Sequence, residues 1–281
     1  MTGVKADLLG RIKATWAAAD ADNAGLLAAG VAFYAFLAIL PLLAAVVLIY
    51  GLVADASTVA EHATRLQQLL PNAAADLIVD QLRDVAAADQ TRTGFGLLVA
   101  IFAALWSATK GAKAVIVALN LVRGVEDGRG FLGRTVIALL ITVAMAVAAV
   151  AGLVAVTALG FIDSLLPGLS PAMLAAIRAV FWLGTALLAA WGLSLVYRYA
   201  PNDVARQWRF TWPGALAATL MWLAATFAFG IYTANFASYN ATYGALGAVV
   251  VTLMWLYISA YLLILGAEWN EVSERGKGGR T

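Results

Sequence analysis

The sequence has no cysteine and a single histidine, His62. The absence of cysteine excludes disulfide bonds and thiolate metal sites, and one histidine cannot supply the clustered ligands of a zinc centre. Charged residues are also scarce, at 12% of the 281 residues, and no basic cluster resembles a nucleic-acid-binding arm. We therefore expect no metal, no cofactor and no nucleic-acid partner.

Catalytic motifs are missing as well. The sequence has no Gly-rich phosphate loop and no His, Asp and Glu spacing typical of a metal site. His62 lies outside the apolar runs, so no Ser–His pair is available within them. A ribonuclease would need metal ligands or a general acid–base pair near its RNA. The sequence thus predicts a protein without catalytic residues, which is not an enzyme.

Hydrophobic residues, in contrast, make up 63% of the chain, above the roughly 45–50% of soluble domains. They form long runs, and a helix needs about 20 apolar residues to cross a bilayer. We predict an all-α fold, a polytopic membrane bundle of six transmembrane helices plus short amphipathic surface helices. The predicted spans are 25–54, 94–120, 131–160, 172–199, 210–234 and 241–269.

The segments outside these spans are predicted from their periodicity. Apolar residues at helical spacing within residues 1–24, from Val4 to Trp16, indicate a cytoplasmic interfacial helix. Polar residues 55–93 with a helical period indicate two amphipathic helices on the periplasmic surface. Residues 25–270 then form the six-helix domain and residues 271–281 a cytoplasmic tail. Pro41 lies inside the first span and is expected to bend that helix without ending it.

The orientation follows from the positions of Lys and Arg. Fourteen of them fall in the N-terminal segment, in the connections after the second and fourth spans or the adjoining span ends, and in the tail. Only three fall on the opposite side, at Arg65, Arg83 and Arg92. Because cytoplasmic loops carry the excess of basic residues, we expect a multi-pass protein of the bacterial inner membrane with both termini in the cytoplasm.

Several short motifs support a family resemblance over residues 20–275. They are Ala32-Phe33-Tyr34, Pro41-Leu42-Leu43, Leu119-Asn120, Tyr199-Ala200-Pro201-Asn202, Trp212-Pro213-Gly214-Ala215, Tyr239-Asn240-Ala241-Thr242-Tyr243-Gly244-Ala245-Leu246-Gly247, Trp255-Leu256-Tyr257 and Leu265-Gly266-Ala267-Glu268. With these motifs the sequence resembles the YihY/BrkB family of bacterial inner-membrane proteins. Ala38 and Arg123 depart from the family pattern, which commonly has Ser and an aromatic residue there. The resemblance implies a six-helix fold and an envelope or transport role, and some members carry an old ribonuclease BN name.

One group of candidate binding residues lies toward the cytoplasmic side. Lys110, Lys113 and Asn120 share a broad stripe of the second span, and Glu268 ends the sixth span at a similar depth. Ionisable residues in a membrane are functional candidates by default, but lysines near a helix end also snorkel to the interface. A Lys110–Glu268 pair would satisfy both charges. A structural pair, an interfacial anchor and an anion gate therefore remain open.

A second group lies toward the outer side. Arg178 is near the start of the fourth span, while Asn235, Tyr239, Asn240 and Tyr243 surround the short turn between the fifth and sixth spans. Arg178 either snorkels outward or faces a cavity with these amides and phenols. In the second case the group suits an anionic or phosphate-bearing ligand.

Together these features favour a secondary transporter or exporter of a small anion or an anionic lipid-like molecule. The alternative is a non-transporting envelope scaffold that handles lipid or binds partner proteins. The expected partners are membrane lipids and such a substrate. A transporter requires a polar cavity lined by Lys110, Glu268 or Arg178, whereas a scaffold would have a closed, apolar interior.

Overall fold

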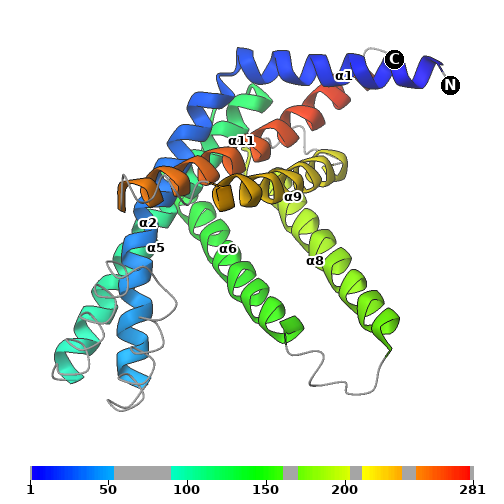
Figure 1. Cartoon of the computed structure of the whole chain (residues 1–281). Coiled ribbons are helices and arrows are strands. Elements are labelled where there is room, and N and C mark those ends of the chain that lie inside the picture. The colour runs from blue at the N-terminus through cyan, green and yellow to red at the C-terminus, as the bar shows by residue number, and fades with distance from the viewer. Residues whose placement is uncertain (1, 54–89, 161–169, 203–210, 236–244, 279–281) are drawn as a thin grey trace. The chain divides into compact units, whose positions relative to one another are not determined.

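The computed structural model of the chain consists of α-helices (Figure 1). It describes residues 2–53, 90–160, 170–202, 211–235 and 245–278. Within these ranges it has seven helices and no strand, which confirms the all-α prediction for this part of the chain. The helices are α1 Thr2–Ala21, α2 Ala24–Val53, α5 Gln90–Arg123, α6 Phe131–Gly160, α8 Pro171–Tyr199, α9 Trp212–Asn235 and α11 Ala245–Gly278.

Among the described residues, four segments are long and apolar enough to cross a membrane. They are Ile101–Arg123 in α5, Pro171–Tyr199 in α8, Trp212–Thr233 in α9 and Val249–Arg275 in α11. The bent pair Leu8–Ala21 and Ala24–Ile39 would make a fifth if it is one broken span, while Phe131–Met145 in α6 is a shorter apolar helix. The total of six spans stays a prediction, as do the surface helices at 55–93, since residues 54–89 lie outside the described ranges.

Two helix bounds bear directly on the sequence predictions. α2 runs through Pro41 to Val53, so the proline does not end the first long apolar helix. α11 continues to Gly278 and includes most of the predicted tail that begins at residue 271. Glu271 and Arg275, one turn apart in this continuation, form an ion pair of 2.9 Å, an arrangement that supports a helix.

A two-residue turn joins α1 to α2 at an angle of 66°. The N–H groups of Asp22 and Asn23 donate to the carbonyls of Ala18 and Asp20, and the Asn23 carbonyl accepts from the first turn of α2. Asn23 has a φ of 54°, a left-handed conformation that asparagine adopts more readily than most residues. The sequence Asp22-Asn23 therefore ends one helix and begins the next.

Two compact units make up the chain, residues 1–33 with 109–281 and residues 34–108. The first unit contains a buried core of alanine and branched aliphatic residues that includes Ala28, Ile116, Leu119 and Ile264. The second contains the remainder of α2 and the first part of α5, where Phe102 and Trp106 stack at 6.1 Å between ring centroids. All side chains discussed below as candidate sites belong to the first unit.

Within the first unit α9 and α11 cross at two glycines. A Cβ atom at Gly214 would overlap the carbonyl of Gly266, and one at Gly266 would overlap the carbonyl of Gly214. Tyr197 from α8 fills the space beside Gly266, and its hydroxyl donates to the Leu263 carbonyl at 2.6 Å. Small residues thus let the helix backbones approach closely, as is common between membrane helices.

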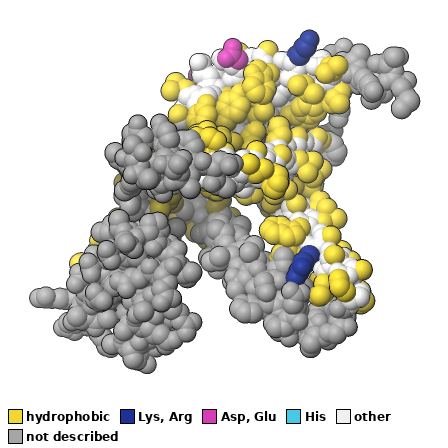
Figure 2. Space-filling view, viewed as in Figure 1, with side chains coloured by type: hydrophobic (Ala, Val, Ile, Leu, Met, Phe, Trp, Pro, Cys, Tyr) yellow, Lys and Arg dark blue, Asp and Glu magenta, His cyan; other side chains and the backbone are white. Residues whose placement is uncertain are grey.

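The outer faces of the helices are apolar. Val180 on α8 is 70% exposed and Phe227 on α9 is 74% exposed. In the view of Figure 2 hydrophobic side chains cover most of the described surface, and the few charged side chains are isolated on it. Exposed apolar surface on this scale indicates contact with something other than water. Together with the lengths of the helices, it is typical of a protein embedded in lipid.

Candidate functional site

α1 lies beside the last turns of α11 (Figure 1). Buried polar side chains gather in this part of the first unit. We call this region the polar end. It includes the ends of α5, α8 and α11 and the start of α9, and its hydrogen bonds join residues distant in sequence. Its main polar residues are Asp22, Asn120, Arg123, Asn202, Thr211, Glu268, Asn270 and Glu271.

The most buried ion pair of the polar end joins α5 to α11. Arg123 Nη1 lies 2.9 Å from Glu271 Oε2 and 2.9 Å from Glu274 Oε2. The side chain of Arg123 is only 2% exposed, and Glu271 also accepts from Arg275. A buried charge is tolerated when it is paired and hydrogen-bonded. This network satisfies its charges internally and is best explained as structural.

Asn270 connects α11 to the start of α9. Its Oδ1 accepts the backbone N–H of Gly214 at 2.8 Å, and its Nδ2 donates to the Thr211 carbonyl at 3.1 Å. The first N–H groups of a helix have no partner within it, so Asn270 acts as a cap supplied by another helix. The Thr211 hydroxyl in turn bonds the hydroxyl of Ser194 on α8.

Asn120, a predicted binding residue, contacts the chain after α8. Its Oδ1 accepts the N–H of Asn202 at 2.8 Å, whereas its Nδ2 is buried without a hydrogen-bond partner in the structure. The connection after α5 lies nearby, since Arg129 donates to the Ala200 carbonyl at 2.8 Å and pairs with Asp127. One half of the Asn120 amide therefore holds the fold, and the other is unsatisfied.

Glu268 differs from the other acidic residues of the polar end. It is 1% exposed, and its Oε1 is buried without a hydrogen-bond partner in the structure. Its carboxyl group faces that of Asp22 in the turn between α1 and α2. The ion pairs of this region join Arg123 and Arg275 to Glu271 and Glu274 and do not include Glu268.

The predicted contact between Lys110 and Glu268 is not found. Lys110 lies on an exposed face of α5, while its neighbours Thr109 and Ala112 are buried. Glu268 is buried against the α1–α2 turn instead. The stripe of the second span was too broad to give the helix phase, and a one-residue change rotates a side chain by about 100°.

The remaining predicted residues fall into two sets. Lys113 is half-buried, with its ammonium group 4.8 Å from the centroid of the Phe131 ring. Arg178 lies on an exposed face of α8. The side chain of Asn235, and the whole of Tyr239, Asn240 and Tyr243, lie outside the described residues, so the predicted outer cluster stays a prediction.

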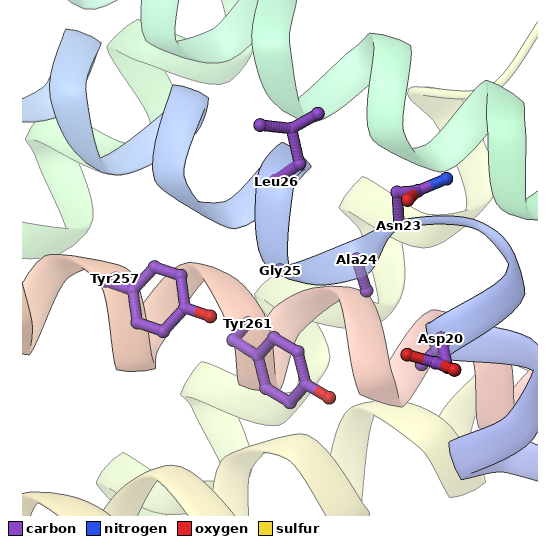
Figure 3. Close-up of a pocket in the computed structure, with 8 residues that line it drawn as sticks. Asp20, Asn23, Ala24, Gly25, Leu26, Tyr257 and Tyr261 are labelled. Atoms are coloured by element: carbon purple, nitrogen blue, oxygen red, sulfur yellow. The ribbon is translucent and has the colours of Figure 1, made fainter.

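An open pocket of about 350 Å³ lies beside the α1–α2 turn. Figure 3 shows Tyr257 and Tyr261 on α11 and Asp20 on α1 around it. The two tyrosine rings stack at 6.2 Å between centroids. The full lining is Ala19, Asp20, Asn23, Ala24, Gly25, Leu26, Tyr257 and Tyr261.

Sequence reasoning missed Asp20, Asp22 and Tyr261 as site residues. The first two follow an amphipathic segment and are typical helix-capping residues, so a local capping role was sufficient to explain them. Tyr261 lies one turn after Tyr257 in an apolar run. Only the packing of α1 against α11 brings these residues together, and nothing in their spacing indicates that contact.

A known protein family and several known proteins match parts of this chain. A family model described as "Virulence factor BrkB" matches residues 15–281. The "Putative ribonuclease-like protein YfkH" of Bacillus subtilis is 34% identical over 189 residues, which are 66% of this chain and 68% of YfkH. A "UPF0761 membrane protein" of Tolumonas auensis is 38% identical over 84 residues, 30% of this chain and 28% of that protein.

Shorter matches are found to further membrane proteins of this kind. A "UPF0761 membrane protein" of Xanthomonas oryzae pv. oryzae is 41% identical over 73 residues, which are 26% of this chain and 17% of that protein. The chain therefore aligns with less than a third of the length of both UPF0761 proteins. No solved structure matches the chain.

Proposed function

The chain belongs to the BrkB virulence factor family and is an integral membrane protein, and from this premise we propose that it is a secondary transporter or exporter. We place it in the bacterial inner membrane with both termini in the cytoplasm, so that the polar end faces the cytoplasm. The substrate class we propose is a small anion or an amphipathic, anionic lipid-like molecule. The name of YfkH calls that protein ribonuclease-like, but we propose no ribonuclease activity here, because the sequence supplies no catalytic pair.

The observation that carries this proposal is the buried carboxyl group of Glu268. It lies within an apolar helix long enough to cross a membrane, and its Oε1 has no hydrogen-bond partner in the structure. A buried ionisable group is costly in such a place, so it is retained where function requires it. The nearby structural charges do not need it, because Arg123 and Arg275 already pair with other glutamates.

The anionic substrate class rests on the lysines of α5. Lys110 lies on an exposed face and Lys113 packs its ammonium group over Phe131. Basic side chains on the cytoplasmic side also attract anionic lipid headgroups. An anion approaching the polar end would therefore meet these two lysines.

Flux measurements on the purified full-length protein in liposomes test this function. We expect uptake of at least one member of a panel of inorganic anions, carboxylates and fluorescent lysophospholipids. Lys110→Ala and Lys113→Ala should each reduce that flux several-fold. Lys13→Ala, which removes an exposed lysine of α1, should not. A folded protein that moves no member of the panel would contradict transport.

A scaffold that handles lipid without transport is the second candidate. One observation favours it, because the pocket beside the α1–α2 turn is not lined by Lys110, Glu268 or Arg178. A scaffold would bind anionic lipid vesicles or partner proteins and would show no flux. The same liposome measurement therefore separates the two functions.

A further inference from the structure

We propose that Asp22 and Glu268 form a proton-binding site, in which the two carboxyl groups share one proton at neutral pH. The site joins the turn after α1 to α11, and its role as the coupling site for transport rests on the proposed function. The proton-binding itself depends only on the geometry of the two carboxyl groups.

The first argument is the proximity of two acids in a buried place. The carboxyl groups of Asp22 and Glu268 face each other, and Glu268 is 1% exposed. Two carboxylates that share a site repel each other, so one of them keeps its proton. A protonated Glu268 is a hydrogen-bond donor, and it would find its acceptor in the carboxylate of Asp22.

The second argument is the unpartnered oxygen of Glu268. Its Oε1 is buried without a hydrogen-bond partner in the structure. A buried carboxylate normally accepts several hydrogen bonds, because its desolvation is otherwise not compensated. A neutral carboxylic acid has a much smaller desolvation cost. The missing partner is thus explained by a bound proton.

The basic side chains near the Asp22–Glu268 pair are paired with other glutamates. Glu271 and Arg275 are the other ionisable groups that act on Glu268, and both lie on α11. Arg275 pairs with Glu271, and Glu271 is shared with Arg123 from α5. Within the described ranges no three His, Asp or Glu side chains gather closely enough to hold a metal ion. A proton therefore fits the site better than a metal ion does.

Asp22 is only part-buried, and residues near it in the chain line an open pocket. Asp20 and Asn23, on either side of Asp22 in the chain, line the open pocket of Figure 3. A proton taken up from water there binds one carboxylate oxygen, and the pair then carries a single negative charge. Release of the proton leaves two charges in a buried place. Loading and unloading the site thus changes how stably the α1–α2 turn packs against α11.

Infrared spectroscopy across a pH titration tests the site on the full-length protein in lipid nanodiscs. We expect the carbonyl stretch of a protonated carboxylic acid at neutral pH, and its loss at alkaline pH. Glu268→Gln should remove this signal. Asp22→Asn should keep it but move its loss to lower pH by about one unit or more, because a neighbouring negative charge is gone. Glu274→Gln, which removes an acid that is paired with Arg123, should change neither.

Several results would overturn the proposal. They are the absence of a protonated carboxyl group at neutral pH, a signal that persists in Glu268→Gln, or a titration unchanged in Asp22→Asn. If Glu268→Gln does not fold, the titration of Asp22→Asn decides alone. The infrared signal needs no substrate, so a protein with the signal but no flux retains the site and loses the transport function. Flux that is independent of a pH gradient removes only the coupling role.

Discussion

Gly214 and Gly266 show how single residues determine the packing of the helices. Each lies where a Cβ atom would overlap the carbonyl of the other. Both also lie in motifs of the family resemblance, Trp212-Pro213-Gly214-Ala215 and Leu265-Gly266-Ala267-Glu268. Close backbone contact is thus the physical reason for glycine at these two positions.

We expect Gly214→Ala and Gly266→Ala each to destabilise the protein by about 1–3 kcal/mol, the usual effect of overpacking. Gly230→Ala is the matched control, since a Cβ atom there meets nothing within 4 Å. It should be neutral or slightly stabilising, because alanine favours a helix over glycine by up to ~1 kcal/mol. Thermal unfolding of the three variants in detergent measures this. An unchanged melting temperature for Gly214→Ala would contradict the close crossing.

Asp127, in the connection between α5 and α6, provides a pH-dependent prediction at the same scale. Burial raises the pKa of its carboxyl group, but hydrogen bonds from Arg129 and the charges of Arg129 and Arg134 outweigh it, so the pKa lies below its ordinary value of 3.8. A carboxylate with a lowered pKa stabilises the fold above its unfolded pKa. That contribution is lost as the pH falls through the folded pKa.

We therefore expect Asp127→Asn to lower the melting temperature at neutral pH. The loss in the free energy of unfolding should be at most about 1 kcal/mol, because the ion-pair network is partly exposed. The difference from the wild type should begin to close below about pH 4 and should vanish as the pH falls through the lowered folded pKa, where the wild-type carboxylate also becomes neutral. Glu126→Gln, at the exposed neighbouring position, is the control and should leave the melting temperature at neutral pH unchanged. A constant difference at all pH values would argue against ionic stabilisation by Asp127.

At the scale of elements, run length and hydropathy predicted the helices well. The predicted spans 131–160 and 172–199 correspond to α6 Phe131–Gly160 and α8 Pro171–Tyr199. Prolines and glycines at the ends of these runs stop a helix locally, so sequence alone indicates the bounds. The sixth predicted span ends at 269, and the predicted tail begins at 271. The helix α11 continues to Gly278, where Glu271 and Glu274 pair with Arg123, which is 148 residues from Glu271.

The candidate site was less predictable than the helices, because it too depends on contacts between residues distant in sequence. Glu268 was predicted as a functional residue from its charge in an apolar run, and the structure buries it. Its neighbour Asp22 could not be predicted, because the contact depends on α1 packing beside α11. Local patterns determine helices, whereas long-range packing determines which of their polar residues meet.

The Arg123 network gives a prediction for how α5 is held to α11. Arg123→Met leaves Glu271 and Glu274 without this partner, and removal of one member of a buried pair costs about 3–5 kcal/mol. Glu274→Gln should cost at most about 1 kcal/mol, since the Glu274 side chain is 32% exposed and Arg123 keeps its bond to Glu271. Chemical or thermal unfolding measures both.

A double substitution tests whether Arg123→Met loses stability because it leaves a buried charge unpaired. Arg123→Met combined with Glu271→Leu should recover part of the stability, because apolar residues of similar size often replace a buried pair without loss. If Arg123→Met alone is as stable as the wild type, the pair contributes nothing to the contact between these helices.

At the scale of the whole molecule, the distribution of charge predicts how the chain lies in the membrane. Fourteen Lys and Arg are assigned to one side and three to the other, and basic residues near span ends stay in the cytoplasm. Arg123 joins α5 to α11 through Glu271 and Glu274, and Arg129, Arg134 and Arg275 also form ion pairs at the polar end, so four of the fourteen basic residues form ion pairs there. From the charge asymmetry we predict that the polar end faces the cytoplasm.

Reporter fusions test this orientation. A reporter after Thr281 should be active only if it functions in the cytoplasm, and one inserted near Asp89 only if it functions in the periplasm. Replacing four basic residues is a sharper experiment. Glutamine in place of Arg129, Arg134, Lys110 and Lys113 should weaken the preference for this orientation. Orientation in the membrane depends on Lys and Arg near the spans and hardly on acidic residues. The inverted reporter pattern in the wild-type chain would place the polar end, and with it the Asp22–Glu268 pair, on the periplasmic side. The proposed proton site would then load from the opposite compartment, although its chemistry would be unchanged.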